Sequence, residues 1–322
     1  MYVTPISFNN TNGYAYRTVS SESRHSLPVS KTTSSDTVSF QGLNLKKYNP
    51  AYKFGFRFLF ESSQINSRKR FSPTISGMEG KLKEVFIPLN NKAKDKIVAY
   101  DINPENTDKY IIFFHGSSQN ISNCQRIYKE ILASRYAVLA PEYSGYGKNK
   151  PIKADESTLN MDIDAALNYL KNKGIKPQNI GVVGHSFGGY AAVSAVTKEP
   201  DAAFAVLISP LNSFRYEVEN VMNSKRFKMP KVFLYAYKMF PNMLKPLENM
   251  LKTEERISKS PVPFYIIHSV NDNWIPVKSS QSLASRARLL KNLIILEEGG
   301  HHVDDGKLVV LGDILKKLNP SS

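Results

Sequence analysis

The chain has 322 residues and a formal net charge of +15, from 43 lysines and arginines against 28 acidic residues. This length suits one large α/β domain or two smaller domains. The excess of positive charge is compatible with a nucleic acid, an anionic membrane surface or an acidic partner, and does not choose among them. A single cysteine, Cys124, excludes an intramolecular disulfide and a zinc site built from several cysteines. The sequence has no apolar run of about 18 residues, so we expect no membrane-spanning helix.

Residues 1–50 are expected to form a disordered tail rich in serine and threonine. These two residue types fill 15 of the first 40 positions, and large apolar residues are sparse. Such a segment buries too little surface to offset the entropy lost on ordering. The tail also resembles the N-terminal export signals of bacterial secreted effectors, so a targeting or secretion segment is the alternative. We therefore expect a cytoplasmic or peripheral membrane protein or, alternatively, an effector secreted into a host cell.

Residues 51–75 are expected to form an aromatic and basic approach segment. Four phenylalanines and a tyrosine between positions 52 and 60 are interspersed with Lys53 and Arg57, and a run of three cations begins at Arg68. Such a segment is too short to cross a bilayer but suits an interfacial anchor on anionic lipid. The alternative is a helix or strand packed on the core, with a solvated basic run behind it.

Residues 76–322 show short β-rich runs that alternate with helical patterns. This alternation predicts an α/β fold, with a mostly parallel sheet and helices on both faces. A hairpin is expected over Lys83–Leu89 and Lys96–Asn103. The strands expected after it are Tyr110–Phe114, Tyr136–Ala140, Ile180–Val183, Phe204–Ser209, Val262–His268 and Leu293–Glu297. The expected helices are Ile121–Arg135, Asp155–Lys173, Phe187–Lys198, Ser279–Leu290 and Leu308–Leu318.

The strongest motif is the segment Gly184-His185-Ser186-Phe187-Gly188, which Gly189 follows. It lies between a predicted strand and a predicted helix, which is the setting of a nucleophile elbow. Such a sharp turn needs small flanking residues, because the backbone of the nucleophile is strained. The turn raises the hydroxyl of Ser186 above the sheet edge and places the positive end of the helix beneath developing negative charge. Ser186 is therefore the predicted nucleophile.

A serine hydroxyl needs a general base, and that base needs an orienting acid. In this architecture the residues follow the chain order serine, acid, histidine. Asp272 follows the predicted strand Val262–His268, and His301 follows the next predicted strand after two glycines. We therefore expect Asp272 as the acid and His301 as the base.

Alternatives remain for both partners of the serine. His302 is the alternative base. Asp304 or Asp305 could replace Asp272, but both are close to the histidine in sequence and at an expected helix start, where stabilising the helix N-terminus is the simpler role. The remaining histidines near the motifs are expected to shape loops, and they are His115, His185 and His268.

The tetrahedral intermediate of acyl transfer carries an oxyanion, which two backbone N–H groups must stabilise. One is expected from Phe187, directly after the nucleophile. The second is expected from Ser117, in the loop after the strand Tyr110–Phe114, where Gly116 permits a sharp bend. This chemistry needs no metal or organic cofactor.

These motifs make residues 78–320 resemble the α/β-hydrolase superfamily and, within it, the Bem46-like, ABHD17-like and ABHD13-like serine hydrolases. The resemblance implies the α/β-hydrolase fold and hydrolysis of carboxylic ester or thioester bonds. The chain departs from the family at Ser117-Ser118-Gln119, where Asn-Ala-Gly is frequent. The matching segments are Phe114-His115-Gly116, Tyr143-Ser144-Gly145-Tyr146-Gly147, Gly184-His185-Ser186-Phe187-Gly188-Gly189, Ser209-Pro210, Asp272 and Gly300-His301.

Residues 212–260 are expected to form a helical lid, inserted before the strand that leads to the acid. Positions 215–259 hold ten lysines and arginines against five glutamates, together with several methionines and aromatic residues. Flexible side chains of this kind suit a chain-like acyl substrate. The alternative is an ordinary helix pair on the sheet with a solvated charged face.

The predicted protein is a serine hydrolase of the carboxylesterase or acyl-thioesterase type, with residues 76–322 as its catalytic domain. Its partner would be an acyl ester or thioester substrate, and its basic surface suits peripheral contact with an anionic membrane. A lipase or phospholipase at a membrane surface, a peptidase of the same fold and a non-catalytic binding protein are the alternatives. No nucleic acid partner is expected, because the sequence has no known nucleic-acid-binding signature. Cys124 is expected to be structural.

Overall fold

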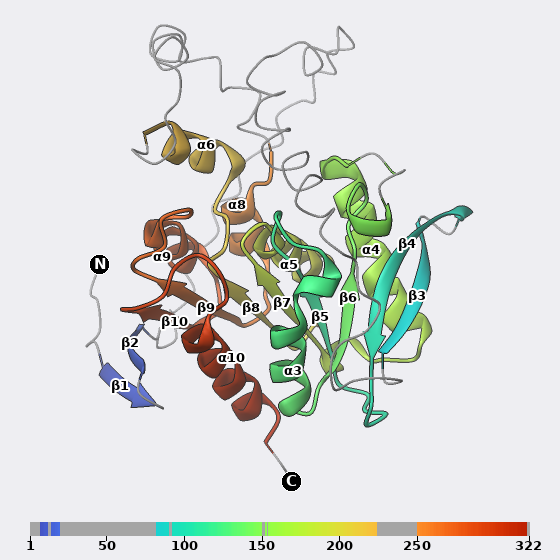
Figure 1. Cartoon of the computed structure of the whole chain (residues 1–322), viewed down its shortest axis with the longest axis horizontal. Helices are drawn as coiled ribbons and strands as arrows, with labels where there is room; N and C mark the ends of the chain where they lie inside the picture. The colour runs from blue at the N-terminus through green and yellow to red at the C-terminus, as the bar shows by residue number, and fades with distance from the viewer. Residues whose placement is uncertain are drawn as a thin grey trace, which may run out of the picture.

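The structure is a computed structural model of the chain, and it describes residues 7–11, 14–19, 82–89, 92–149, 152, 154–223 and 250–320. Within these residues one sheet of ten strands has the order β1-β2-β10-β9-β8-β7-β5-β6-β4-β3 (Figure 1). The central run from β6 to β10 is parallel, whereas both ends of the sheet are antiparallel. This is the mostly parallel sheet that the alternating pattern predicted.

The described elements run in the following order. The strands are β1 Ser7–Thr11, β2 Tyr14–Val19, β3 Leu82–Leu89, β4 Lys92–Ile102, β5 Tyr110–Phe114, β6 Ala137–Pro141, β7 Ile180–His185, β8 Phe204–Ile208, β9 Phe264–Ser269 and β10 Leu290–Leu296. The α-helices are α3 Gln125–Ala133, α4 Glu156–Asn172, α5 Phe187–Lys198, α6 Phe214–Asn223, α8 Thr253–Lys259, α9 Val277–Arg286 and α10 Asp305–Leu318. Short 3-10 helices lie at Ile121–Asn123, Gly147–Asn149 and Pro177–Asn179.

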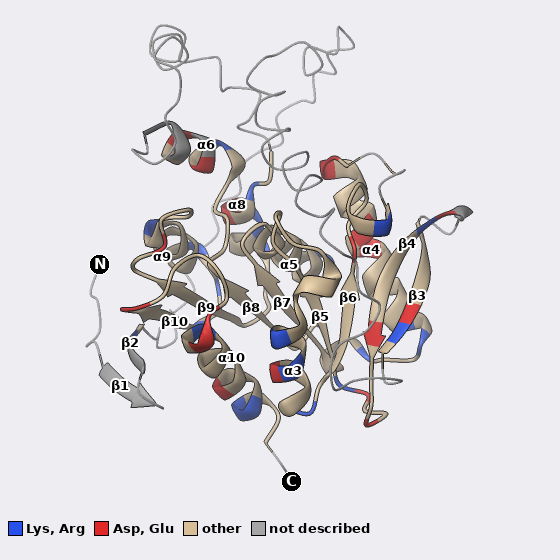
Figure 2. Ribbon diagram, in the orientation of Figure 1, with Lys and Arg blue, Asp and Glu red and all other residues tan. Residues whose placement is uncertain are grey.

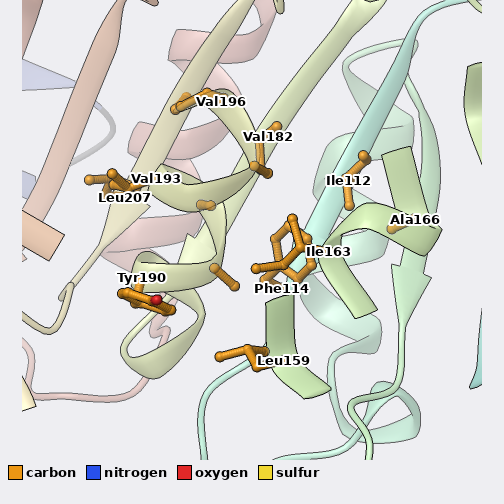
Figure 3. Close-up of a cluster of buried hydrophobic side chains, with 14 of the residues drawn as sticks. Ile112, Phe114, Leu159, Ile163, Ala166, Val182, Tyr190, Val193, Val196 and Leu207 are labelled. Atoms are coloured by element: carbon orange, nitrogen blue, oxygen red, sulfur yellow. The ribbon is translucent and has the colours of Figure 1, made fainter. Parts of the chain in front are cut away.

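Helices cover both faces of the sheet, because the side chains of the central strands are apolar on both sides. Every residue of β5 is buried. Its alternate side chains enter two cores: Ile112 and Phe114 pack in a core with α4 and α5, and Ile111 and Phe113 pack in a core with α3 and α10. Figure 3 shows the first core, where side chains of α4 and α5 surround Phe114. Each fully buried side chain of this size contributes about 1.5–3 kcal/mol to folding.

The disordered tail expected over residues 1–50 does not hold for residues 7–11 and 14–19. These two strands form a hairpin, and β2 pairs antiparallel with β10 at the edge of the sheet. Tyr16 packs against the core beneath α10, and Arg17 Nε lies 2.8 Å from Glu297 Oε1. The rest of the tail and the whole approach segment, residues 51–75, lie outside the described residues.

Composition over the whole tail hides this hairpin, because pairing depends on a short local pattern. Strand β2 carries two tyrosines and a valine, which favour extended backbone. The main hydrogen bonds that hold β2 are those with the backbone of β10. This backbone edge of β10 becomes available once the other edge of β10 has paired with β9.

The lid expected over residues 212–260 is described only at its ends, where α6 and α8 lie. Residues 224–249 lie outside the described residues, so the lid stays a prediction. Both described ends belong to the connection between β8 and β9 and lie near the same end of the sheet (Figure 1).

Helix caps account for two boundaries that differ from the expected ones. Helix α10 begins earlier, at Asp305, because the side chain of Asp304 accepts a hydrogen bond from the Lys307 N–H and caps the helix. Helix α3 begins later, at Gln125, because Asn120 caps a separate 3-10 helix that precedes it.

A buried carboxyl group joins α4 to the loop after β6. Asp162 has no exposed surface, and it accepts hydrogen bonds from the Ser144 N–H at 2.8 Å and from the Ser144 hydroxyl at 2.7 Å. Burial raises the pKa of Asp162 to about 7, although both hydrogen bonds from Ser144 act in the opposite direction. The folded chain therefore holds a proton on Asp162 at pH values where the unfolded chain has already lost it.

The free energy of unfolding is expected to fall as the pH rises from about 4 to about 7, because in this window only the folded chain binds the proton on Asp162. A shift of about three pKa units corresponds to a contribution on the order of 4 kcal/mol. In Asp162→Asn the amide can still pair with Ser144 but does not titrate, so the fall should become smaller. Urea unfolding from weakly acidic to weakly basic pH measures it. The exposed Asp201→Asn is the control, and equal pH dependence in Asp162→Asn and the wild type would contradict the assignment.

Candidate active site

Ser186 occupies the sharp turn between β7 and α5. Its backbone has φ 56° and ψ −118°, a conformation that residues other than glycine rarely adopt. The turn is tight because Gly184 and Gly188 approach each other so closely that a methyl group on Gly184 would overlap the Gly188 carbonyl. The Ser186 N–H donates to the Ile208 carbonyl at 2.9 Å, and the Ser186 carbonyl accepts from the Leu211 N–H at 3.2 Å. Neighbouring backbone therefore holds Ser186 in its strained conformation.

His301 lies between the predicted nucleophile and the predicted acid. Its Nε2 is 2.9 Å from Ser186 Oγ, and its Nδ1 is 2.8 Å from Asp272 Oδ2. A carboxylate only accepts hydrogen bonds, so Nδ1 carries the hydrogen and Nε2 is free to accept the serine proton. The three side chains form one continuous line of hydrogen bonds, and the Asp272 side chain at its inner end has no exposed surface.

The sheet topology explains why residues so far apart in sequence meet. Ser186 follows β7, Asp272 follows β9 and His301 follows β10, and the three strands belong to one parallel run with β8 between the first two. The carboxyl ends of parallel strands lie at the same edge of a sheet, where functional side chains of α/β folds gather.

Asp272 is held as a charged carboxylate. Burial alone would raise its pKa, but hydrogen bonds from His268 and His301 outweigh burial and hold the pKa of Asp272 well below its usual range. Its other oxygen, Oδ1, accepts hydrogen bonds from the N–H groups of Trp274 and Ile275, each at 2.9 Å. These contacts fix the orientation of the carboxylate that faces His301.

The alternatives to His301 and Asp272 have other contacts. The carbonyl of His302 accepts a hydrogen bond from Lys307 Nζ at 2.9 Å. Asp304 caps α10, and Asp305 forms an exposed ion pair with Arg126. The structure therefore brings Ser186, Asp272 and His301 together and places the two other acids at the start of the helix.

The loop that carries His301 is held by two buried side chains whose contacts the sequence did not predict. Lys307 has no exposed side-chain surface and donates to the carbonyls of Gly300 and His302, on either side of His301. His185 Nε2 donates to the His301 carbonyl at 3.0 Å. Burial, and next the nearby His301, lower the pKa of His185 to about 3, so it remains neutral.

His268 shapes a loop, as expected, and also contacts the acid. Its Nδ1 lies 2.7 Å from Ser280 Oγ, and its Nε2 lies 2.9 Å from the Ile275 carbonyl and 3.2 Å from Asp272 Oδ2. Both Nε2 partners are acceptors, so Nε2 carries the hydrogen and Nδ1 accepts from Ser280. Asp272 therefore lies between two buried or nearly buried imidazoles.

The loop after β5 lies against the start of α5. Strands β5 and β7 are neighbours, with Phe114 opposite Gly184. A methyl group at Gly188 would overlap the Phe114 carbonyl, so the glycine permits this approach. The arrangement places Ser117, which is partly exposed, and Phe187, the first residue of α5, on two adjoining elements. Their roles as oxyanion donors stay predictions.

Two exposed apolar side chains lie close to the acid in the chain. Trp274 is 39% exposed, and its ring is stacked on His301 at 6.1 Å between ring centroids with 28° between the planes. Val270, at the end of β9, is also exposed. The surroundings of His301 thus include apolar surface that faces solvent.

Several expectations concern features other than the three aligned side chains. Cys124 is buried, and burial raises the pKa of its thiol. Within residues 82–89, 92–149, 154–223 and 250–320 and the N-terminal hairpin, no group of three or more histidine, cysteine or acidic side chains is placed to hold a metal ion. No helix in the same described part of the chain is long and apolar enough to cross a membrane.

Comparisons with known proteins give the same fold. The family model described as serine aminopeptidase, S33 matches residues 105–245. The uncharacterized protein YfhR of Escherichia coli O157:H7 is 26% identical over 246 residues, covering 74% of this chain and 77% of that protein. Human alpha/beta hydrolase domain-containing protein 17B is 27% identical over 224 residues, covering 68% of this chain and 69% of that protein. A Pyrococcus furiosus esterase structure has a TM-score of 0.61 at 19% identity and covers 77% of this chain and 95% of that chain.

The expected resemblance to the α/β-hydrolase superfamily is therefore confirmed. The expected similarity to the ABHD17-like proteins is also confirmed, through alpha/beta hydrolase domain-containing protein 17B. The strand order, the turn at Ser186 and the two curated relatives all agree with it. The chain therefore has the α/β-hydrolase fold, matches a family model of that superfamily over residues 105–245, and shows distant homology to YfhR and to alpha/beta hydrolase domain-containing protein 17B.

Proposed function

We propose that this α/β-hydrolase is a serine hydrolase that cleaves carboxylic ester or thioester bonds of acyl or lipid-like substrates through an acyl-enzyme intermediate. The observation that carries the proposal is the line of hydrogen bonds from Ser186 Oγ through His301 to Asp272, at 2.9 and 2.8 Å. A serine held at a strained turn, with an oriented base in contact with its hydroxyl, has the geometry of an activated nucleophile.

In the acylation step His301 Nε2 takes the proton of the Ser186 hydroxyl while the oxygen attacks the substrate carbonyl. The carbonyl oxygen becomes an oxyanion, which the N–H groups of Ser117 and Phe187 stabilise. His301 then gives its proton to the departing alcohol or thiol, and the acyl group stays on Ser186. Asp272 keeps the proton on Nδ1 and stabilises the imidazolium that forms between the two transfers.

Deacylation repeats the same steps with water. His301 takes a proton from the water, whose oxygen attacks the acyl carbonyl, and then returns that proton to Ser186 Oγ as the acid leaves. The low pKa of Asp272 suits both halves, because a carboxylate that stays charged keeps His301 in the tautomer that can accept a proton.

The apolar surroundings of His301 support an acyl or lipid-like substrate. Trp274 presents 39% of its surface to solvent while it stacks on His301, so a chain entering the site can bury apolar area there. Lysines and arginines lie on α3, α9 and α10, and acidic residues also lie on α3 and α10 (Figure 2). Contact of these cations with an anionic membrane stays part of the proposal. The description of the matched family model, a serine aminopeptidase, favours a peptidase as the second candidate.

Replacing Ser186 by alanine should abolish covalent labelling by a fluorophosphonate probe and lower kcat for p-nitrophenyl esters by at least about 10³-fold. The reason is that no other hydroxyl lies in contact with His301 Nε2 among the described side chains. Ser285→Ala, at an exposed position of α9, is the matched control and should label like the wild type. Equal labelling of Ser186→Ala and the wild type would contradict the assignment, and a folded wild type that neither labels nor hydrolyses would favour a binding protein.

Replacing Asp272 by asparagine should lower kcat by about 10²–10⁴-fold with a smaller change in KM. An amide can donate to Nδ1 of His301, which shifts the proton to Nε2 and leaves no acceptor for the serine hydroxyl. Steady-state kinetics on one ester substrate measure the effect, and circular dichroism checks that the variant is folded. A folded Asp272→Asn protein with kcat close to that of the wild type would exclude Asp272 as the orienting acid.

Replacing Trp274 by alanine should raise KM for long-chain acyl esters by about 10-fold and change KM for acetyl esters less, because only a long chain covers the indole ring. A series of esters and thioesters from acetyl to dodecanoyl, with and without anionic liposomes, measures this selectivity. Phe86→Ala is the control, since Phe86 is 60% exposed on β3 at the other end of the sheet. A preference for acetyl esters that liposomes do not change would contradict the lipid-like substrate, and faster cleavage of aminoacyl amides would favour the peptidase.

A further inference from the structure

We propose that the buried pair formed by His115 and Glu142 positions the oxyanion hole, by fixing the Gly116–Ser117 peptide so that the Ser117 N–H faces the reacting carbonyl oxygen. This inference rests on the proposed function and assigns a role to two residues outside the line of Ser186, His301 and Asp272. They act through the backbone of the loop and do not touch the reacting atoms.

The pair is fully enclosed. Neither side chain has exposed surface, and His115 Nε2 lies 2.8 Å from Glu142 Oε1. The two residues follow the neighbouring parallel strands β5 and β6. The rings of Tyr143 and Tyr146 pack on the imidazole, with centroids at 4.3 and 5.7 Å. The second oxygen of Glu142 accepts from the Ile121 N–H at 3.3 Å, so the carboxyl group is held from both sides.

The outer nitrogen of this imidazole reaches the oxyanion loop. His115 Nδ1 lies 2.8 Å from the carbonyl oxygen of Gly116. A carbonyl only accepts, and two acceptors repel at that separation, so Nδ1 carries a hydrogen and donates it. By the same reasoning a second proton is shared between Nε2 and Glu142 Oε1, which are also 2.8 Å apart. Glu142 on the opposite nitrogen keeps the ring in the plane that this donation needs. A buried carboxyl that orients an imidazole is the same device that Asp272 provides for His301.

Three hydrogen bonds then fix the orientation of the loop backbone. The Gly116 carbonyl also accepts from the Gln119 N–H at 3.1 Å, and the carbonyl of His115 accepts from the Tyr143 hydroxyl at 2.8 Å. In a planar trans peptide the C=O and the following N–H point in opposite directions. Holding the Gly116 carbonyl toward the buried imidazole therefore turns the Ser117 N–H away from it, out of the core.

The opposite side of the loop borders the start of α5. A methyl group placed on Gly116 would lie 3.1 Å from His185 Nδ1, and His185 directly precedes Ser186. The Gly116 N–H is itself occupied, because it donates to Gln119 Oε1 at 2.9 Å. Two N–H groups border the bend, those of Gly116 and Ser117. Because the Gly116 N–H is occupied, only the Ser117 N–H can be oriented toward the substrate by His115 and Glu142.

A matched pair of double variants isolates the donor at Nδ1. Both carry Glu142→Leu, which removes the carboxyl that would otherwise remain unpaired, and they differ only in His115→Asn or His115→Leu. Asparagine and leucine have the same shape, but only the asparagine amide nitrogen can replace Nδ1 as donor to Gly116. We expect the variant with leucine at position 115 to lose about 10–10²-fold in kcat/KM relative to the variant with asparagine, with KM for substrate nearly unchanged.

Binding of a trifluoromethyl ketone separates positioning from general structural damage. This inhibitor adds to the catalytic serine and forms the tetrahedral oxyanion, so its affinity should fall by the same factor as kcat/KM. Ser144→Ala is the control, because it disturbs the buried Asp162 in the same segment without touching the His115 loop, and it should lower thermal stability while leaving the inhibitor affinity unchanged.

The outcomes distinguish this inference from the proposed function. A wild type that neither hydrolyses esters nor binds the ketone would refute the proposed function itself. An active wild type whose two double variants bind the ketone equally would overturn the role of His115.

If the variant with two leucines does not fold, Tyr143→Phe tests the same loop, since it removes only the hydroxyl that donates to the His115 carbonyl. It should lose about 3–10-fold in kcat/KM and in ketone affinity together, and unchanged values would overturn the inference.

Discussion

The turn between β7 and α5 imposes the constraint on which the rest of the site depends. Ser186 has a positive φ, which costs on the order of 1–3 kcal/mol for a residue with a side chain. The surrounding backbone offsets this cost, since the amide and carbonyl of Ser186 are bonded to the end of β8 and the loop after it. The glycines of the turn let α5 approach the end of β5. The turn at this strained residue is therefore joined by hydrogen bonds to the end of β8 and by close backbone contact to the end of β5.

Buried side chains hold the loops of the site by their carbonyl groups. Lys307 donates to the carbonyls on both sides of His301, and His185 donates to the carbonyl of His301 itself. The pair of His115 and Glu142 reaches the Gly116 carbonyl in the same way. A carbonyl held from the core fixes the peptide plane and hence the direction of the next N–H and side chain. In a regular helix or strand, the repeated backbone hydrogen bonds fix the orientation of each peptide plane. In these irregular loops, hydrogen bonds from buried side chains fix it instead.

The sequence predicted the parts of this protein that depend on local pattern. Buried strands such as Tyr110–Phe114 are continuous apolar runs, and the elbow around Ser186 has small residues at fixed offsets. The chain order of the motifs placed Asp272 and His301 after the correct strands. Charge and polarity gave no comparable signal for Glu142 or Lys307, because a charged residue beside a loop or at a helix start is usually solvated.

The remaining differences came from contacts between distant segments. The contact of His268 with Asp272 depends on how a four-residue bend folds back, and one sequence does not show that bend. The hairpin at residues 7–19 depends on the edge of β10, at the opposite end of the chain. Average composition described the tail correctly as polar but could not report a partner strand so far away in sequence.

That hairpin has a consequence for the order in which the molecule forms. Strand β2 is the second described strand in chain order and its partner β10 is the tenth, so their pairing closes a very large loop of the chain. Pairing over so great a sequence separation is slow and comes late in folding. Because β10 also leads directly to His301, the outer edge of the sheet and the base of the site depend on the same segment. Ser186 precedes His301 by 115 residues, so the serine acquires its base only once β10 has taken its place in the sheet.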